Sequence, residues 1–356
     1  MYGFVVATLV ASSVLTATEV ITTAIEICGR ITRDMQPFAI QPYNPQGDEQ
    51  QVYALWQRTL GHLWPLSRAA FRRVTVASDV YRPGDHLVAL AGHEIVGFAG
   101  TQAWLVPGER TPRGELLLMM VDPAYQRRGI GRALLERALA VLEERGAEEV
   151  QVGGGGLTYF WPGVPANPPA AWPFFQACGW TEAERSFDLA LDLSGYVTPP
   201  GIYERIRLPD VTISTGTPED GPSLLAFEAQ HFPEWLHFYQ EVMGQGGHAD
   251  VVLARHPDHG IVGASCAGHP RVVWQRPDFV WEQLLGENVG ELGPLGVLEA
   301  ARENGIGLAL AARVTELLRG RGARTAYVGW TWLVDWYGKL GYHIWQEYVM
   351  SWARVS

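Results

Sequence analysis

Cysteine and positive charge are both scarce in this sequence. The 356 residues include three cysteines, Cys28, Cys178 and Cys266, which are too few and too scattered for a disulfide framework or a zinc site. We therefore expect no metal site and a reducing compartment, the cytoplasm. The formal net charge of −11 argues against a general nucleic-acid binder, because such proteins present a basic face to phosphates. An acidic chain mildly favours a cationic or amine substrate, although solubility explains the charge equally well.

Long uninterrupted hydrophobic runs are also lacking. Residues 1–34 are mostly apolar, but Glu19 and Glu26 interrupt them, and no basic segment precedes them as a signal peptide requires. The longest charge-free run, residues 1–18, is borderline for a membrane span. We expect either an additional N-terminal helix or upstream sequence before a start at Met35, rather than a membrane anchor.

Two familiar phosphate-binding motifs are missing, and a different pattern stands in their place. A Walker loop needs Gly-Lys-Ser/Thr, which is absent, and a Rossmann fingerprint needs a third glycine where Leu134 stands. Residues 114–152 instead predict a strand, a tight loop, a helix, a turn and a second strand. The apolar run Leu116–Val121 is short enough for a buried strand, and residues 126–131 follow the pattern Q-x-x-G-x-G.

The chemistry of this loop favours an anionic ligand. Gly129 and Gly131 place no side chain between the backbone and a ligand, and the N–H groups of the first helical turn lack intrahelical partners. The helix dipole and the charges of Arg127 and Arg128 add positive potential there. This arrangement suits a diphosphate. The alternative is an ordinary glycine turn at the start of a helix.

The same unit returns later in the chain at a constant offset of 176 residues. Glu115 corresponds to Glu291, and the glycines Gly129 and Gly131 correspond to Gly305 and Gly307, with no gap over the whole unit. A repeat of this length indicates two homologous domains rather than a solenoid. The expected division is a leader over residues 1–34, a first domain over 35–194, a linker over 195–210 and a second domain over 211–356.

These residues resemble the GCN5-related N-acetyltransferase (GNAT) superfamily. In that superfamily a Q/R-x-x-G-x-G/A loop between a strand and a helix holds the diphosphate of acetyl-coenzyme A, and a later helix ends in Y-x-K-L-G-F/Y. Residues 337–342 match the second pattern, and residues 175–180 offer F-Q-A-C-G-W instead. The resemblance implies an α/β (α+β) fold with two tandem GNAT domains, each a mixed, mostly antiparallel central sheet flanked by helices, with a splayed central strand. The two-domain plan is similar to that of mycothiol synthases.

The resemblance also implies acetyl-coenzyme A as cosubstrate. The second loop has Glu303 and Asn304 where the first has Arg127 and Arg128, so one charge is reversed. Backbone amides do most of the holding, so either loop or both can bind acetyl-coenzyme A. The positions that match the cofactor-binding segments are Met119, Met120, Val121, Gln126, Arg127, Arg128, Gly129, Ile130, Gly131 and Arg132 in the first half, and Leu295, Gly296, Val297, Arg302, Glu303, Asn304, Gly305, Ile306 and Gly307 in the second.

Acetyl transfer to an amine requires a deprotonated amine, a stabilised carbonyl oxygen and a protonated leaving thiolate. The resemblance implies Tyr337 as the general acid, whereas its counterpart Phe175 has no proton to give. We therefore expect the chemistry in the C-terminal domain. Gly293 and Pro294 also predict a splay in the second central strand, because proline cannot donate to a strand ladder. The first central strand lacks such a marker.

The general base is less well defined by the sequence. Glu291 on the central strand and Glu234 in an aromatic-rich segment are the preferred candidates. The other candidates are Glu228, His231, Asp250 and Asp335. We expect transfer of acetyl to a primary amine of a small molecule by a monomer or homodimer. The alternatives are a non-catalytic acetyl-coenzyme A sensor or interaction protein, and catalysis in the N-terminal domain with Tyr159 as acid.

Overall fold

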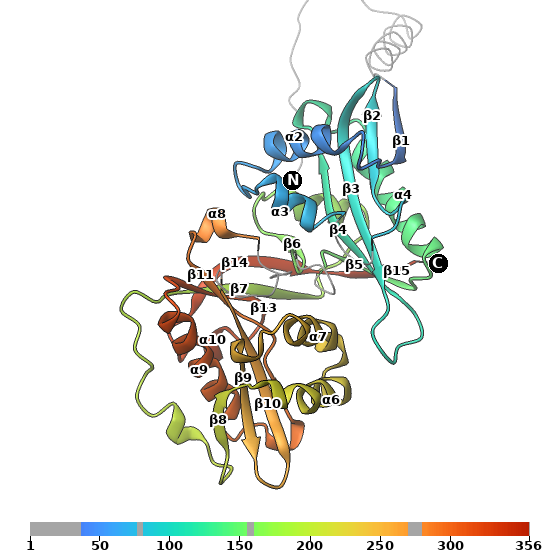
Figure 1. Ribbon diagram of the computed structural model, residues 1–356. Coiled ribbons are helices and arrows are strands. Elements are labelled where there is room, and N and C mark those ends of the chain that lie inside the picture. The colour runs from blue at the N-terminus through green and yellow to red at the C-terminus, as the bar shows by residue number, and fades with distance from the viewer. Residues whose placement is uncertain (1–36, 77–80, 155–159, 270–279, 356) are drawn as a thin grey trace, which may run out of the picture.

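The computed structural model describes residues 37–76, 81–154, 160–269 and 280–355. The leader expected over residues 1–34 lies outside these ranges, as does Tyr159. The described chain forms two sheets, one in each lobe of the molecule (Figure 1).

The first sheet contains six strands in the order β1-β2-β3-β4-β5-β15. Its neighbouring strands are antiparallel except for the parallel pair β4 and β5. These strands are β1 (Phe38–Pro42), β2 (Leu87–Ala91), β3 (Glu94–Trp104), β4 (Arg113–Val121), β5 (Glu149–Val152) and β15 (Trp352–Arg354).

Helices cover both faces of the first sheet. Phe98 and Ala99 of β3 point to opposite faces, as neighbours in a strand must, and join different cores. Phe98 packs on the side of α2 and α3, and Ala99 packs on the side of α4. The apolar face predicted for α4 is buried. The helices of this half are α2 (Glu49–Thr59), α3 (Arg68–Arg73), α4 (Ile130–Glu144) and α5 (Ala171–Ala177).

The second sheet follows the order β6-β14-β7-β13-β11-β10-β9-β8, and β12 also pairs with β10. The only parallel pair recorded among its described strands is β11 with β13. Its strands are β6 (Val164–Pro165), β7 (Glu184–Asp192), β8 (Thr212–Thr215), β9 (Val251–His256), β10 (Gly260–Gly268), β11 (Val289–Leu292), β12 (Gly296–Val297), β13 (Thr325–Thr331) and β14 (His343–Met350).

Helices also flank the second sheet on both faces. Leu253 of β9 packs with α6 and α7, and the adjacent Val252 and Ala254 pack with α9. The helices of this half are α6 (Gly221–His231), α7 (Leu236–Gly244), α8 (Glu282–Leu285), α9 (Ile306–Gly320) and α10 (Val334–Gly338). Both sheets are therefore mixed and mostly antiparallel, as the sequence predicts.

The two halves exchange strands. β7, which precedes the linker, lies between β13 and β14 of the second half, with Ala190 opposite Tyr327. In return β15, at the end of the chain, pairs with β5, with Ala353 opposite Val150. The boundary expected at residue 194 thus follows a strand that joins the second sheet. Figure 1 shows β7 and β14 running side by side between the two lobes.

An aromatic cluster fills the interface that this exchange creates. The rings of Trp64 and Trp281 lie 4.8 Å apart, and the ring of Phe160 is stacked on Trp281 at 5.4 Å. All three side chains are buried. Burial of each contributes roughly 1.5–3 kcal/mol, so residues from both halves share one core.

A buried carboxylate also crosses the exchange. Asp188 of β7 accepts hydrogen bonds from the hydroxyls of Tyr327 at 2.8 Å and Tyr348 at 2.7 Å. Its other oxygen accepts the backbone N–H of Trp330 at 2.9 Å. Because Asp188 comes from the first half and its donors from the second, this contact fixes the register of the exchanged strand.

Both central strands are irregular. The second is divided into β11 and β12 around Gly293 and Pro294, which confirms the predicted splay. The first central strand, β4, carries a register shift in its pairing with β3, because Gly100 pairs with Leu118 and Thr101 pairs with Leu116. In each half the parallel pairing with the next strand extends no further than the central glutamate, Glu115 or Glu291.

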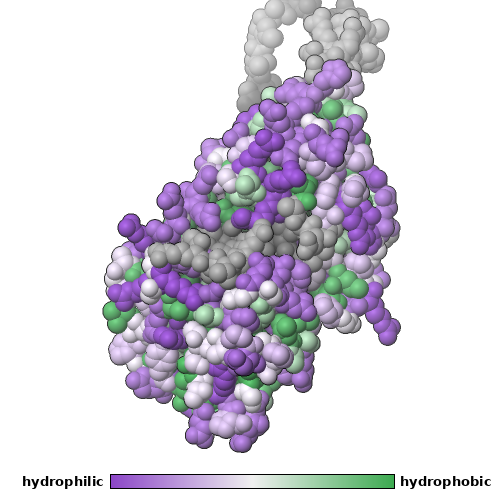
Figure 2. All heavy atoms as spheres, viewed as in Figure 1, coloured by the Kyte–Doolittle hydropathy of each residue, from purple (hydrophilic) through white to green (hydrophobic). Residues whose placement is uncertain are grey.

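The visible surface is mixed in character. On the face shown in Figure 2, hydrophobic residues form separate patches among hydrophilic ones. Within the described ranges, none of the helices combines the length and the apolar character needed to cross a membrane.

Candidate active site

The two glycine loops have the same backbone conformation. We call residues 126–131 the first loop and residues 302–307 the second loop. Arg127 and Glu303 occupy equivalent positions with φ of 63° and 64°, and Gly129 and Gly305 follow with φ of 86° and 79°. Each loop leads into a helix of 15 residues. Left-handed backbone at a non-glycine residue is costly, so its recurrence in both halves reflects a shared geometric requirement.

The first loop is open. A Cβ added to Gly129 would meet nothing within 4 Å. Across the residues that the structure describes, no protein acceptor is recorded for the N–H groups of residues 127–131. Arg127 is exposed beside these groups. A helix N-terminus with bare amides and an adjacent cation fits a diphosphate, so the first loop suits coenzyme A.

The second loop is covered by the linker. A Cβ on Gly305 would lie 2.2 Å from the carbonyl oxygen of Arg205. The backbone N–H of Arg207 donates to the carbonyl of Asn304 at 3.0 Å, and its guanidinium donates to the carbonyl of Glu303. We call residues 203–207 the covering segment. Sequence reasoning treated these residues as a spacer only, since their contact with the loop has no local signal.

The second glycine of each loop serves helix packing. A Cβ on Gly131 would lie 3.1 Å from the ring of Phe174, and one on Gly307 would lie 3.2 Å from the ring of Trp336. These aromatic rings belong to the equivalent helices α5 and α10. The sequence interpretation assigned both glycines to ligand approach. The space around Gly129 is open, and Gly131 also allows the close packing of Phe174.

The first domain places a buried carboxylate where β4 and β5 separate. Glu115 is 3% exposed, and it accepts hydrogen bonds from Gln102 Nε2 at 2.7 Å and Trp104 Nε1 at 3.0 Å. A Cβ on Gly114 would face Val150 and Ala147 on the α4 side, so Glu115 faces the α2 side. Sequence reasoning named Glu115 only as the counterpart of Glu291 and did not select it as a base.

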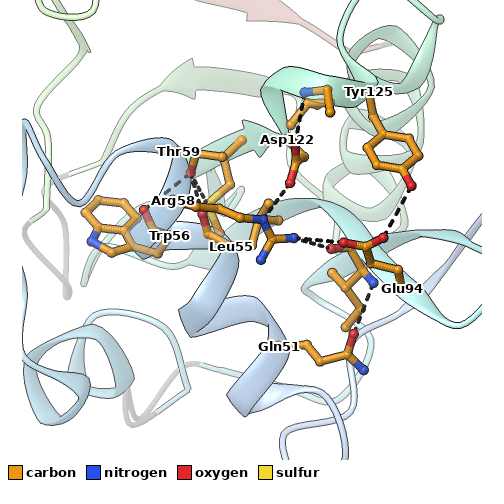
Figure 3. Close-up of polar contacts among 12 residues, drawn as sticks. Gln51, Leu55, Trp56, Arg58, Thr59, Glu94, Asp122 and Tyr125 are labelled. Atoms are coloured by element: carbon orange, nitrogen blue, oxygen red, sulfur yellow. Dashed lines mark hydrogen bonds and ion pairs between the residues drawn. The ribbon is translucent and has the colours of Figure 1, made fainter.

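A polar network joins helix α2 to the turn that precedes the first loop (Figure 3). Asp122, immediately before the short 3-10 turn Pro123–Tyr125, accepts a hydrogen bond from Arg58 Nε at 2.5 Å. Arg58 also lies 3.6 Å from Glu94. No local sequence pattern marks this network, because its members are far apart in the chain.

The three predicted catalytic residues lie on different elements. Tyr337 of α10 is buried against Trp336 and Tyr342 in the core shared with α9, and burial raises the pKa of its hydroxyl. Glu291 lies on β11 beside Tyr327 of β13. Glu234 lies in the 3-10 turn Pro233–Trp235. A Cβ on Gly290 would meet Leu318 of α9, so Glu291, the next residue, faces away from the helix against which Tyr337 packs.

The remaining candidate bases have different surroundings. Glu228 of α6 is fully buried, and within the described part of the chain neither carboxyl oxygen has a hydrogen-bond partner. Burial, reinforced by the nearby charge of Glu234, raises the pKa of Glu228 to about 8. Asp250 accepts a hydrogen bond from the guanidinium of Arg321. His231 is half-buried at the end of α6, and Asp335 is exposed in α10.

A metal centre finds no support in the part of the chain that is described. The structure holds there no group of three or more His, Cys, Asp or Glu side chains with the arrangement of a metal site.

Comparison with known sequences agrees with this geometry. Residues 49–180 match the family described as the acetyltransferase (GNAT) family. A mycothiol acetyltransferase of Clavibacter sepedonicus is 29% identical over 215 residues, which cover 57% of this chain and 60% of that relative. A ribosomal protein bS18 alanine N-acetyltransferase of Escherichia coli K12 is 38% identical over 68 residues, which cover 19% of this chain and 39% of the relative. The chain thus spans less than two thirds of the length of these relatives.

Solved structures show the same two-domain arrangement. A glucosamine N-acetyltransferase region of a fungal multi-domain beta-N-acetylglucosaminidase is similar over 90% of this chain and 38% of that chain, with 30% identity and a TM-score of 0.82. A tandem GNAT protein of the clavulanic acid pathway has a TM-score of 0.58 at 17% identity, over 89% of this chain and 98% of that chain. Residues 49–180 therefore match the acetyltransferase (GNAT) family, and the chain has the fold of tandem GNAT proteins.

Proposed function

We propose that this chain is an acetyl-coenzyme A-dependent N-acetyltransferase that acts on a primary amine of a small molecule. The relatives of known activity are N-acetyltransferases. One similar structure is a glucosamine N-acetyltransferase region, which makes amino sugars the first acceptor class to test.

The cofactor is assigned to the first domain, which favours the alternative of N-terminal catalysis over the expected C-terminal site. The observation that carries this assignment is the contrast between Gly129, which faces open space, and Gly305, which faces the carbonyl of Arg205. The amides of the first loop and the charge of Arg127 would hold the diphosphate. Bound acetyl-coenzyme A would supply an acetyl group activated as a thioester.

Glu115 is the carboxylate of the first domain's central strand that we assign as the base. It faces the α2 side from the central strand, and its two side-chain donors, Gln102 and Trp104, orient the carboxylate. An ammonium acceptor would transfer its proton to Glu115, and the free amine would then form the new C–N bond as the C–S bond breaks. Phe175 has no exchangeable proton, so the departing thiolate would take up, through water, the second proton that the nitrogen loses as the amide forms.

A second candidate keeps catalysis in the C-terminal domain. It is favoured by Tyr337, which carries a hydroxyl at the position that Phe175 occupies in the first half. In this alternative the diphosphate would bind the second loop beside the covering segment, whose hydrogen bonds go to the carbonyls of Glu303 and Asn304. A third outcome, binding of acetyl-coenzyme A without transfer to any amine, would support the sensor alternative.

The two loops provide matched variants for a test. Arg127→Glu copies the residue that already adopts this backbone conformation at Glu303, and Glu303→Arg is the reciprocal change. If the first loop binds the diphosphate, Arg127→Glu weakens acetyl-coenzyme A binding about tenfold or more, since a lost charge-assisted contact contributes 1.5–3 kcal/mol. Glu303→Arg leaves the affinity unchanged. The dissociation constants are measured by calorimetry, and thiol release is followed with amino sugars, amino acids and polyamines.

The opposite pattern would contradict the assignment. If Glu303→Arg changes the affinity and Arg127→Glu does not, the cofactor lies in the second domain. If acetyl-coenzyme A binds tightly but none of the tested amines causes thiol release, the proposed transferase activity is overturned.

A further inference from the structure

The guanidinium of Arg58 connects helix α2 to the strand end that precedes the first loop (Figure 3). Its Nε donates to Asp122 Oδ2 at 2.5 Å, and its Nη2 donates to the carbonyl of Ile95 at 3.1 Å. Arg58 lies in the last turn of α2. The helix is therefore held at that end to both β3 and the residue after β4.

Asp122 is the centre of this connection. Its Oδ1 accepts the backbone N–H of Ala124 at 2.9 Å, and its own N–H donates to the carbonyl of Val96 at 2.8 Å. The Asp122 side chain is 11% exposed and that of Arg58 is 39% exposed. A carboxylate this buried requires a partner, and Arg58 supplies one to the residue that starts the turn into the loop.

A second route reaches the loop itself. Glu94 lies 3.6 Å from Arg58 and accepts a hydrogen bond from the Tyr125 hydroxyl at 3.2 Å. The guanidinium of Arg128 lies over the Tyr125 ring at 5.1 Å, and it donates to the carbonyl of Ala124 at 2.9 Å. Contacts thus continue from Arg58 to a loop residue without a gap.

The second half forms the same turn around an apolar residue that packs on the core, in place of this carboxylate. Leu298 stands where the first half has Asp122, and its φ and ψ of −46° and 131° nearly equal the −50° and 128° of Asp122. Its N–H makes the equivalent bond, to the carbonyl of Val262 at 2.9 Å. Asp122 and Arg58 therefore lie beside the open loop, whereas the covered loop has Leu298 at the position of Asp122.

We propose that Arg58 is a positioning residue that holds the first loop in its binding conformation and couples it to α2. The proposal rests on the proposed function, which places acetyl-coenzyme A at the first loop. Glu115 faces the same side of the sheet as α2. Loss of Arg58 therefore has two effects, a looser first loop and a shifted α2. The looser loop weakens cofactor binding. The shift of α2 raises the KM for the amine more than it lowers kcat.

Arg58→Met tests this proposal, with Arg255→Met as a matched control. Arg255 pairs with Asp220 at 2.7 Å near the start of α6, on the second domain and away from the first loop. Two quantities are measured on the full chain: the acetyl-coenzyme A dissociation constant and amide hydrogen exchange of residues 122–131 without ligand. Arg58→Met raises the dissociation constant roughly fivefold to tenfold, within the usual range of coupling between sites, and speeds exchange in residues 122–131.

The control changes neither quantity, although both variants lower Tm. Asp122→Asn produces a similar effect, and the double variant Arg58→Met/Asp122→Asn adds little to it, because both substitutions break one contact. Arg58→Lys recovers part of the affinity.

Two results overturn the proposal and are distinguishable. If the wild-type chain binds acetyl-coenzyme A and Arg58→Met binds equally well with unchanged loop exchange, Arg58 is structural and the proposed function stands. If the wild-type chain does not bind acetyl-coenzyme A, both this inference and the cofactor assignment fail.

Discussion

The backbone carbonyl of Arg205 lies so close to Gly305 that a Cβ on the glycine would approach it to 2.2 Å. The covering segment therefore uses the glycine of the second loop as a docking point. The same glycine in the first loop, Gly129, faces open space. Duplication has left two loops of one conformation with different neighbours, and the following predictions depend on that difference.

Alanine substitution at the two loop glycines separates strain from collision. Both residues have positive φ, so each Gly→Ala variant costs roughly 1–2 kcal/mol of left-handed strain. Gly305→Ala adds a collision with the covering segment, whereas Gly129→Ala adds none. We expect Gly305→Ala to lower the free energy of unfolding clearly more than Gly129→Ala in denaturant titration. Equal losses would show that the covering segment is only loosely held.

Glu115→Gln should impair catalysis without weakening the cofactor. The amide cannot accept a proton, so kcat falls by about 100-fold, in the range of general base catalysis, while the acetyl-coenzyme A dissociation constant is unchanged. Glu291→Gln is the matched control at the equivalent strand position, and Tyr337→Phe tests the C-terminal acid. Steady-state kinetics with an amine that supports thiol release measure all three. A large loss of kcat in Glu291→Gln or Tyr337→Phe, with little loss in Glu115→Gln, would move the chemistry to the second domain.

The buried Glu228 should make stability depend on pH. Its pKa is about 8 in the folded chain and 4.5 for the ordinary group, so the folded state holds the proton more tightly. Its contribution to stability is greatest below pH 4.5 and is lost as the pH rises from 4.5 to 8. At pH 7 the loss amounts to about 3 kcal/mol.

Glu228→Gln removes this titration. The free energy of unfolding, measured by urea titration between about pH 5 and 9, should fall with pH less steeply in the variant than in the wild type. An unchanged slope would mean that Glu228 is not protonated in the folded chain.

Asp188→Asn should weaken the contact between the exchanged strands. The carboxylate accepts two tyrosine hydroxyls and one backbone N–H, and an amide has a single acceptor oxygen. We expect a loss of about 3–5 kcal/mol in the free energy of unfolding, typical of a broken buried network. Tyr327→Phe and Tyr348→Phe should each cost less, about 1 kcal/mol. A loss for Asp188→Asn no larger than that of one Tyr→Phe change would contradict this role.

The sequence predicts the parts of this molecule whose signal is local or repeated. The glycine loops, the amphipathic α4 and the break at Gly293 and Pro294 each follow from a few adjacent residues, and the repeat of the glycine-loop unit reveals two homologous halves. The resemblance of these motifs to the GNAT superfamily implied the tandem fold.

Contacts between distant segments had no such signal. The exchange of β7 and β15 depends on pairing across the whole chain, and the covering segment reads only as a linker until its contact with Gly305 is seen. Arg58 and Asp122 are separated by 64 positions. The sequence therefore located both glycine loops but could not distinguish the open loop from the covered one.

A crystal structure of the full chain with coenzyme A is the most direct test of this account. The prediction is one coenzyme per chain, with its diphosphate against the N–H groups of residues 127–131 and with the covering segment still seated on Gly305. A diphosphate bound at residues 303–307, with Arg205 displaced, would contradict it.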